Sequence, residues 1–246
     1  LVYIYVKKKQ LSSFDGMLNF ISNEQGKLQF NGHLDLKLMN IFDTGEQFMF
    51  FWNRIGEEQQ RFNVATEIPY VFASPFSTAL SFDIYKQDST FLNTTFKGDV
   101  LYALNSKTQF RLSYVTENSD ELSESIQNQI AAFTNYFVGL GFTYKIIKNN
   151  DMLFRNRFAV NIRASFGERF IEKATSQMKF NFSVSYLHDF TRKSKFFIRN
   201  ETGVLISNSF VENEVFRIGG ANSIRGFNEQ SIFSSRYSFF NLEYQY

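Results

Sequence analysis

Residues 28–38 of the chain read Leu28-Gln-Phe-Asn-Gly-His-Leu-Asp-Leu-Lys-Leu38 and alternate apolar or small with polar side chains without an interruption. Successive side chains of a β-strand point to opposite faces, so this alternation predicts a strand with one apolar and one polar face. The stretch is about twice as long as the five or six residues of an average strand. It therefore predicts a long strand that separates an apolar from a wet environment.

The same parity returns along the chain, with apolar side chains mostly at even-numbered positions and charged side chains at odd-numbered ones. Gly, Asn, Asp and Ser clusters separate these units and indicate turns. Two longer polar stretches, 116–129 and 167–176, are predicted to be loops. The pattern predicts about twelve strands, near residues 14–22, 27–39, 45–54, 59–71, 76–86, 90–104, 107–117, 133–147, 152–166, 178–190, 195–207 and 236–246.

The composition combines many aromatic residues with a polar average. Aromatics make up 18% of the 246 residues, 32 of them Phe, yet the mean hydropathy is −0.25. A transmembrane barrel interleaves apolar with polar residues in this way, over strands of about 9 to 11 tilted residues. A soluble β-sandwich would also alternate, but its strands would be shorter and its polar faces would not gather arginines. We expect an all-β fold, a transmembrane antiparallel β-barrel.

The chain lacks the residues that several classes of protein function require. With a net charge of +2, the chain is not basic enough to indicate a nucleic-acid partner, and it has no Cys. Its two histidines, His33 and His188, cannot supply the three or four ligands of a zinc site. Asp15, Asp35 and Asp99 are interpreted as lumen-lining charges rather than an acid–base pair. We therefore expect no enzymatic activity, no cofactor and no metal.

The stretch Arg217-Ile-Gly-Gly-Ala-Asn-Ser-Ile-Arg-Gly-Phe227 is the main irregular segment. Gly219 and Gly220 allow backbone angles that other residues avoid, and Ser223 is typical of a turn. A single cation, Arg225, follows between Ile224 and Gly226. The stretch indicates a folded loop that carries the positive charge of Arg225 to a fixed place; a surface hairpin with an incidental arginine is the alternative.

Residues Ile224-Arg-Gly-Phe227, preceded by the Gly219-Gly220 pair and followed by Asn241-Leu-Glu-Tyr244, resemble a motif of the BamA/TamA-type outer-membrane assembly factor superfamily. These are bacterial surface antigen type barrels with POTRA domains upstream. The segment Ile68-Pro-Tyr-Val-Phe72 also resembles the end of the family's fourth strand. The resemblance implies that an extracellular loop near 208–235 folds into the lumen, where Arg225 pairs with Glu243.

The resemblance also implies a domain organisation. Residues 1–10 would be the end of a periplasmic POTRA domain or a linker, and residues 11–246 the transmembrane barrel. Because family barrels have sixteen strands, we expect the twelve strands here to be part of a larger, C-terminally incomplete barrel. Closure of twelve strands on themselves is the alternative.

In function, the resemblance implies an outer-membrane protein assembly and insertion factor in the outer membrane of a Gram-negative bacterium. Such a factor templates the folding of client β-barrels at a lateral gate in its own wall. The expected partners are outer-membrane lipids, unfolded outer-membrane protein clients, and accessory periplasmic or lipoprotein subunits. The expected gate is the first predicted strand, with Phe14, Gly16, Leu18, Asn19 and Phe20.

Three alternatives stay open. The same superfamily includes polypeptide-secretion pores of the two-partner type and barrels that anchor a patatin-like enzyme. A passive porin would share the alternation but has no reason to carry the Ile224–Phe227 motif. The sequence upstream of the barrel would separate the first two from an assembly factor.

Overall fold

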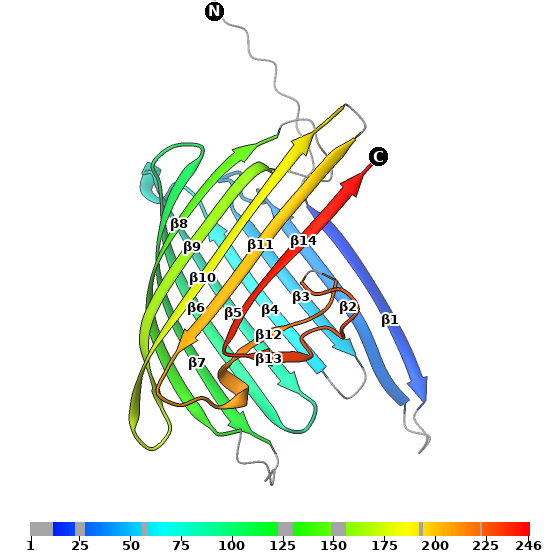
Figure 1. The fold of residues 1–246 in the computed structure, drawn as a ribbon, viewed down its shortest axis with the longest axis vertical. Helices are drawn as coiled ribbons and strands as arrows, with labels where there is room; N and C mark the ends of the chain where they lie inside the picture. The colour runs from blue at the N-terminus through cyan, green and yellow to red at the C-terminus, as the bar shows by residue number, and fades with distance from the viewer. Residues whose placement is uncertain are drawn as a thin grey trace, which may run out of the picture.

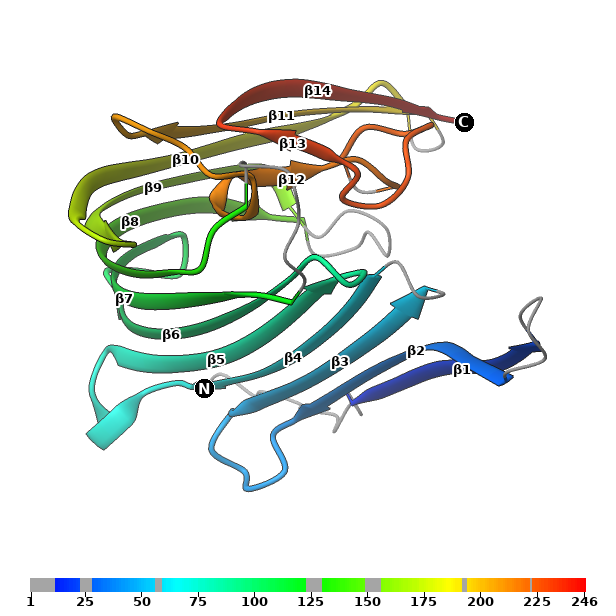
Figure 2. The ribbon, with the colours of Figure 1, turned by 90° about the horizontal axis from the view of Figure 1, so that it is seen from below.

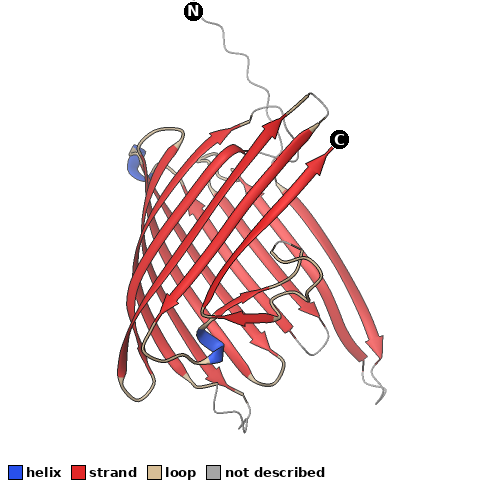
Figure 3. Cartoon of the chain, viewed as in Figure 1, coloured by secondary structure: helices blue, strands red, loops and turns tan. Residues whose placement is uncertain are grey.

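The computed structural model describes residues 12–22, 28–55, 59–122, 130–148, 156–191, 194–221 and 223–246. Residues 1–10, the predicted end of a POTRA domain, lie outside them. Most of the described chain is β-strand, with two single-turn 3₁₀ segments, η1 (Val71–Ala73) and η2 (Glu212–Glu214) (Figure 3). The predicted all-β class is confirmed. In the described part of the chain, no helix is long and apolar enough to cross a lipid bilayer.

Twelve strands form one antiparallel sheet in which each strand pairs with its neighbours in the sequence, except that β11 pairs with β14 (Figure 1). A second small sheet joins β12 (Phe216–Ile218) to β13 (Ile232–Ser234). The strands of the large sheet are β1 (Ser13–Ser22), β2 (Leu28–Met39), β3 (Gln47–Ile55), β4 (Gln59–Ile68), β5 (Phe76–Gln87), β6 (Phe91–Ala103), β7 (Thr108–Glu121), β8 (Phe133–Ile147), β9 (Asn156–Phe170), β10 (Ala174–Asp189), β11 (Lys195–Ile206) and β14 (Arg236–Gln245).

The sheet curls into an open trough rather than a closed cylinder. Figure 2 shows its strands following one continuous curve, with β12 and β13 on the concave side. Among the described strands, β1 pairs only with β2, and β14 pairs only with β11. Two strand edges, one on β1 and one on β14, thus border the opening.

The convex face carries the even-numbered apolar side chains. Leu140 is 65% exposed, Phe166 58% and Phe240 66%, and each belongs to the predicted apolar set. Ring contacts join neighbouring strands on this face, as in Phe50–Phe62 with centroids 5.4 Å apart. An apolar surface of this extent, spread over every strand, is far larger than a soluble monomer exposes.

The concave face carries the odd-numbered side chains and is polar. Asp99, Ser113 and Asn135 are nearly or fully buried there, beside apolar residues such as Leu101 and Phe137. The burial is produced in part by the segment between β11 and β14, which folds against this face. The predicted separation of an apolar from a polar face is confirmed.

The predicted loops at 116–129 and 167–176 are wrong in part. Strand β7 continues to Glu121, because its ladder with β6 extends as far as the Phe91–Glu121 pair. Likewise β9 and β10 form a hairpin whose ladder runs to the Ala174–Phe170 pair. At these strand ends both faces are polar, so the alternation that marks the strand is lost while the backbone pairing continues.

Strand β4 ends three residues earlier than the predicted 59–71. Pro69 lacks an N–H and interrupts the ladder after Ile68. The chain then turns through left-handed backbone at Tyr70 (φ 52°) and Phe72 (φ 54°), which is uncommon for bulky side chains. Phe72 is 98% exposed, so η1 projects an aromatic side chain from the rim.

We expect the apolar and the polar face of the sheet to differ in how well they tolerate a charged substitution. Leu34, in the middle of β2, lies on the apolar face, and its neighbour Asp35 lies on the polar face. In a lipid bilayer, Leu34→Arg is expected to lower the free energy of unfolding by about 2 to 4 kcal/mol, since it places a charge in hydrocarbon. Asp35→Arg is the matched control and is expected to have a small effect.

The measurement is denaturant unfolding of both variants in lipid vesicles. Equal destabilisation by the two substitutions would show that the faces are assigned wrongly.

Candidate functional site

The candidate site is the inward loop, which we define as residues 207–235 between β11 and β14 (Figure 1). From Ile206 the chain turns onto the concave face, forms η2, and then forms the β12–β13 hairpin with a glycine-rich turn at its tip. It contains the motif residues Gly219, Gly220, Ile224, Arg225, Gly226 and Phe227. Asn222 lies outside the described residues.

Asn213 is the most deeply seated polar residue of the loop, with 1% of its surface exposed. Its side-chain amide donates hydrogen bonds to the Ser119 hydroxyl and to the Ala131 carbonyl, both at 2.7 Å. Its backbone carbonyl accepts a hydrogen bond from the Asn93 side chain, also at 2.7 Å. One loop residue is thereby fixed to β6, β7 and the chain just before β8, and its buried polar atoms are satisfied.

Glu214 makes a buried ion pair with Arg169 of β9, and the two side chains are 0% and 4% exposed. The second carboxylate oxygen accepts a hydrogen bond of 2.8 Å from Gln177 of β10. Arg169 also donates to the hydroxyl of Ser209 at 2.7 Å and to its carbonyl at 3.3 Å. A buried pair with this many hydrogen bonds resists opening, because separating it would leave a desolvated charge.

Arg217 fastens the loop to the opposite part of the wall. Its guanidinium lies 3.9 Å from the centre of the Tyr85 ring of β5 and 5.8 Å from that of Phe91 of β6. Such a cation–π contact is worth about 2 kcal/mol when it is desolvated. Burial lowers the pKa of Arg217 from its ordinary value, but an arginine stays charged at neutral pH.

The tip of the loop requires glycine at two neighbouring positions. Gly219 has φ 117° and Gly220 has φ 99°, a backbone conformation that L side chains rarely adopt. A Cβ at Gly219 would lie 2.6 Å from the Asn228 carbonyl oxygen, and one at Gly220 would overlap the Glu229 carboxylate. The turn is closed by hydrogen bonds from the Gly219 amide to the Ser223 hydroxyl at 2.8 Å and from Gly220 to the Ile224 carbonyl at 3.2 Å.

The structure brings Arg225 and Glu243 together. The guanidinium donates a hydrogen bond to Glu243 Oε1, and the neighbouring Asn241 side chain donates to the Ser223 carbonyl at 3.0 Å. The Arg225 side chain is 62% exposed and the Glu243 side chain 29%. Phe227 is 55% exposed and Gly226, with φ 93°, has open space around it. This end of the loop is therefore wetter than the end that holds Asn213 and Glu214.

Residues Phe14, Gly16, Leu18, Asn19 and Phe20, the expected gate, all lie on β1. This strand pairs with β2 along its whole length, from Ser13–Lys37 to Ser22–Leu28. Asp15 lies directly opposite Asp35 in that ladder, an opposition of like charges that destabilises a strand pair. At the other end, the Phe20 and Phe30 rings contact each other at 5.3 Å. The ladder is thus weaker at its Ser13–Gly16 end.

In the described part of the chain, the titratable side chains outside the loop do not form a catalytic or metal-binding cluster. The His33 ring contacts Phe51, and His188 contacts Phe190. Within the described ranges, no three His, Cys, Asp or Glu side chains are placed to hold a metal ion. Asp99 is not isolated, because it forms ion pairs with Arg111 and with Lys97.

The sequence placed Asn213, Glu214 and Arg217 within the predicted loop, but it did not predict their contacts with the wall or the part played by Arg169. Arg169 lies in a stretch that was predicted to be a loop, and its partner Glu214 is 45 residues away. The contact between Asn93 and Asn213 spans 120 residues. The local sequence carried no signal, since residues 211–216 are three consecutive polar residues, Glu212 to Glu214, flanked by Val211 and Val215-Phe216.

Comparisons with known proteins support the fold. No family model matches the chain, and no curated protein matches it. The structure is similar to the crystal structure of BamA from Haemophilus ducreyi lacking POTRA domains 1-3, with a TM-score of 0.58 and 11% sequence identity. The match covers 89% of this chain and 52% of the BamA chain, so the chain spans about half of that structure's length. The fold is therefore similar to that of the BamA β-barrel, and at this identity the likeness extends to the fold alone.

We expect the exposed ion pair and the buried ion pair of the loop to contribute different amounts to the free energy of unfolding. Arg225→Ala and Glu243→Ala are each expected to lower the free energy of unfolding by about 1 kcal/mol or less, because the pair is solvent-screened. Arg169→Ala and Glu214→Ala are each expected to lower it by about 3 to 5 kcal/mol, since each leaves a buried charge unpaired. Both pairs should be non-additive in double-mutant cycles.

Denaturant unfolding in lipid vesicles measures both cycles. If the Arg225–Glu243 defects add up without coupling, the two side chains are not in direct contact. If that cycle shows the larger coupling, the loop is held at its tip rather than at η2.

Proposed function

We propose that this chain is the wall of an outer-membrane assembly factor that helps client β-barrels insert and fold, with β1 as its lateral gate. The role requires no catalysis: a client strand adds to the β1 edge through backbone hydrogen bonds. The proposal places the convex face in lipid and the loop in the lumen. It also assigns residues 1–10 to the end of a POTRA domain or a linker.

The observation that carries the proposal is the β1–β2 ladder. Strand β1 is the first strand of the sheet and is paired through the β1–β2 ladder. Its outward side chains Phe14 and Phe20 are 71% and 70% exposed. The Asp15–Asp35 opposition weakens the same ladder. A strand with a weakened ladder is suited to exchange partners.

The inward loop supports an assembly role over a passive porin. A porin needs a water-filled lumen, whereas this loop buries Asn213 and Glu214 against the inner wall and places Arg217 over the Tyr85 ring. The contacts of Asn213, Glu214 and Arg217 attach the loop to β5, β6, β7, β9 and β10 and not to β1. Motion at the gate then need not disturb the rest of the sheet.

Site-specific photo-cross-linking during client insertion tests the proposal. Leu18 of β1 and Leu112 of β7 are matched positions, because both point outward and are 49% and 51% exposed. With a photoreactive amino acid at either position, the full-length protein in lipid vesicles is expected to accelerate client folding. Client adducts are expected at Leu18 and not at Leu112.

Accelerated folding with equal adducts at both positions would contradict a gate at β1. Adducts at an inward position such as Thr143 instead would favour a polypeptide-secretion pore. Absence of any acceleration would remove the assembly role and leave the porin and enzyme-anchor alternatives.

A further inference from the structure

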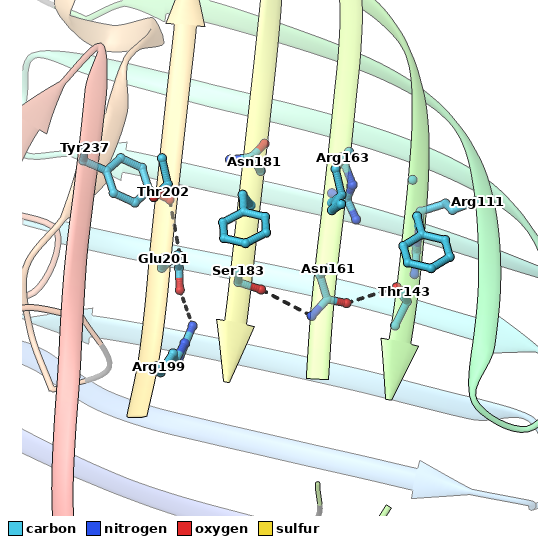
Figure 4. Close-up of a pocket in the computed structure, with 14 residues that line it drawn as sticks. Arg111, Thr143, Asn161, Arg163, Asn181, Ser183, Arg199, Glu201, Thr202 and Tyr237 are labelled. Atoms are coloured by element: carbon cyan, nitrogen blue, oxygen red, sulfur yellow. Dashed lines mark hydrogen bonds and ion pairs between the residues drawn. The ribbon is translucent and has the colours of Figure 1, made fainter. Parts of the chain in front are cut away.

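A second feature of the inner wall lies on the strands β7 to β14, away from the gate. One cross-strand row passes through five ladders on the concave face (Figure 4). Its members in order are Arg111, Gly141, Arg163, Asn181, Gly203 and Tyr237. All of them except Gly203 line a cavity of about 290 Å³.

Gly141 makes the floor of this cavity. It lies between Arg111 on β7 and Arg163 on β9, and a Cβ at this position would lie 3.1 Å from the Arg111 Cβ. Because neighbouring strands are about 4.8 Å apart, the two arginine backbones are separated by about 10 Å with bare glycine between them. The row thus forms a cleft with one arginine on each side.

The two arginines are not equivalent. Arg111 forms an ion pair with Asp99, which also binds Lys97 at 3.0 Å. Arg163 makes no hydrogen bond or ion pair with the described residues, although it is close enough to both Arg111 and Asp99 for their charges to interact with its own. A guanidinium with five N–H donors thus stands over the cavity without an acceptor.

The charges around the cavity do not balance. Arg199, which also lines it, is paired with Glu201. The charged side chains on and directly behind the lining are four cations, Lys97, Arg111, Arg163 and Arg199, and two carboxylates, Asp99 and Glu201, so the net charge is +2. A dianion would neutralise this excess.

The wall of the cavity is also held in place. The Thr143 hydroxyl donates to the Asn161 side chain at 3.0 Å, and Asn161 donates to the Ser183 hydroxyl at 3.3 Å (Figure 4). Tyr237 lies over Gly203, where a Cβ would overlap its ring, and its hydroxyl donates to Glu201 at 3.3 Å. The cleft is therefore built from side chains whose positions are set by their neighbours.

We propose that this cleft binds a phosphate group, held between the Arg111 and Arg163 guanidinium groups above Gly141. Arginine presents a planar fork that matches phosphate oxygens, and the net charge of +2 matches a phosphate dianion. The site is independent of the proposed assembly role, since it lies on strands far from β1.

Isothermal titration calorimetry of the full-length protein with inorganic phosphate tests the site. Arg163→Gln is expected to weaken binding by about ten-fold or more, because it removes charge-assisted hydrogen bonds. Gly141→Leu should weaken it as well, by filling the floor while keeping both arginines. Arg61→Gln is the matched control: it removes the same charge from the inner wall at a residue already paired with Asp83 at 2.9 Å.

Titration with glycerol 3-phosphate is the second arm of the experiment. It distinguishes binding of a phosphomonoester, such as a lipid headgroup presents, from binding of free phosphate. Binding of either ligand with the expected dependence on Arg163 and Gly141 supports the site. Three results would overturn it: no binding of either ligand, equal weakening by Arg61→Gln, or acetate binding as tightly as phosphate. Heat-modifiable migration on a gel confirms that each variant is folded.

Discussion

The structure depends on the need of each backbone N–H and C=O group for a partner where no water is present. A β-sheet whose convex face meets hydrocarbon must satisfy these groups between strands, and eleven consecutive ladders do so here. Once the backbone is paired in this way, successive side chains have only two directions. The even-numbered apolar set and the odd-numbered polar set follow from that geometry, and the loop can fasten only to the polar side.

The same constraint explains which parts of the structure were predictable from the sequence. Strand β2 could be identified from residues 28–38, because a period of two is a local signal. The ends of β7, β9 and β10 could not, because polar residues on both faces remove the period where the backbone pairing still continues. The β12–β13 hairpin was missed for another reason: strands of three residues are too short to show alternation.

The candidate site was predictable only in part. The pairing of Arg225 with Glu243 followed from a family resemblance, since the lumenal face of β14 can be inferred from parity but its loop partner cannot. Asn213, Glu214 and Arg169 form the drier anchor, yet a polar residue that faces a lumen looks like one that faces solvent. Partners 45 to 120 residues apart become neighbours only after the sheet has curled. Likewise the Asp15–Asp35 opposition depends on register, which periodicity alone does not set.

The structure is held together unevenly, because the inward loop ties β5 to β10 together whereas the β1–β2 ladder contains the Asp15–Asp35 opposition. Hydrogen–deuterium exchange of the protein in lipid bilayers tests this distribution most directly, since it reports opening segment by segment. We expect residues 211–216 to exchange as slowly as β6 to β10, and β1 to exchange fastest among strands β1 to β11. Equal protection of β1 and β6, or rapid exchange throughout residues 211–216, would contradict the account.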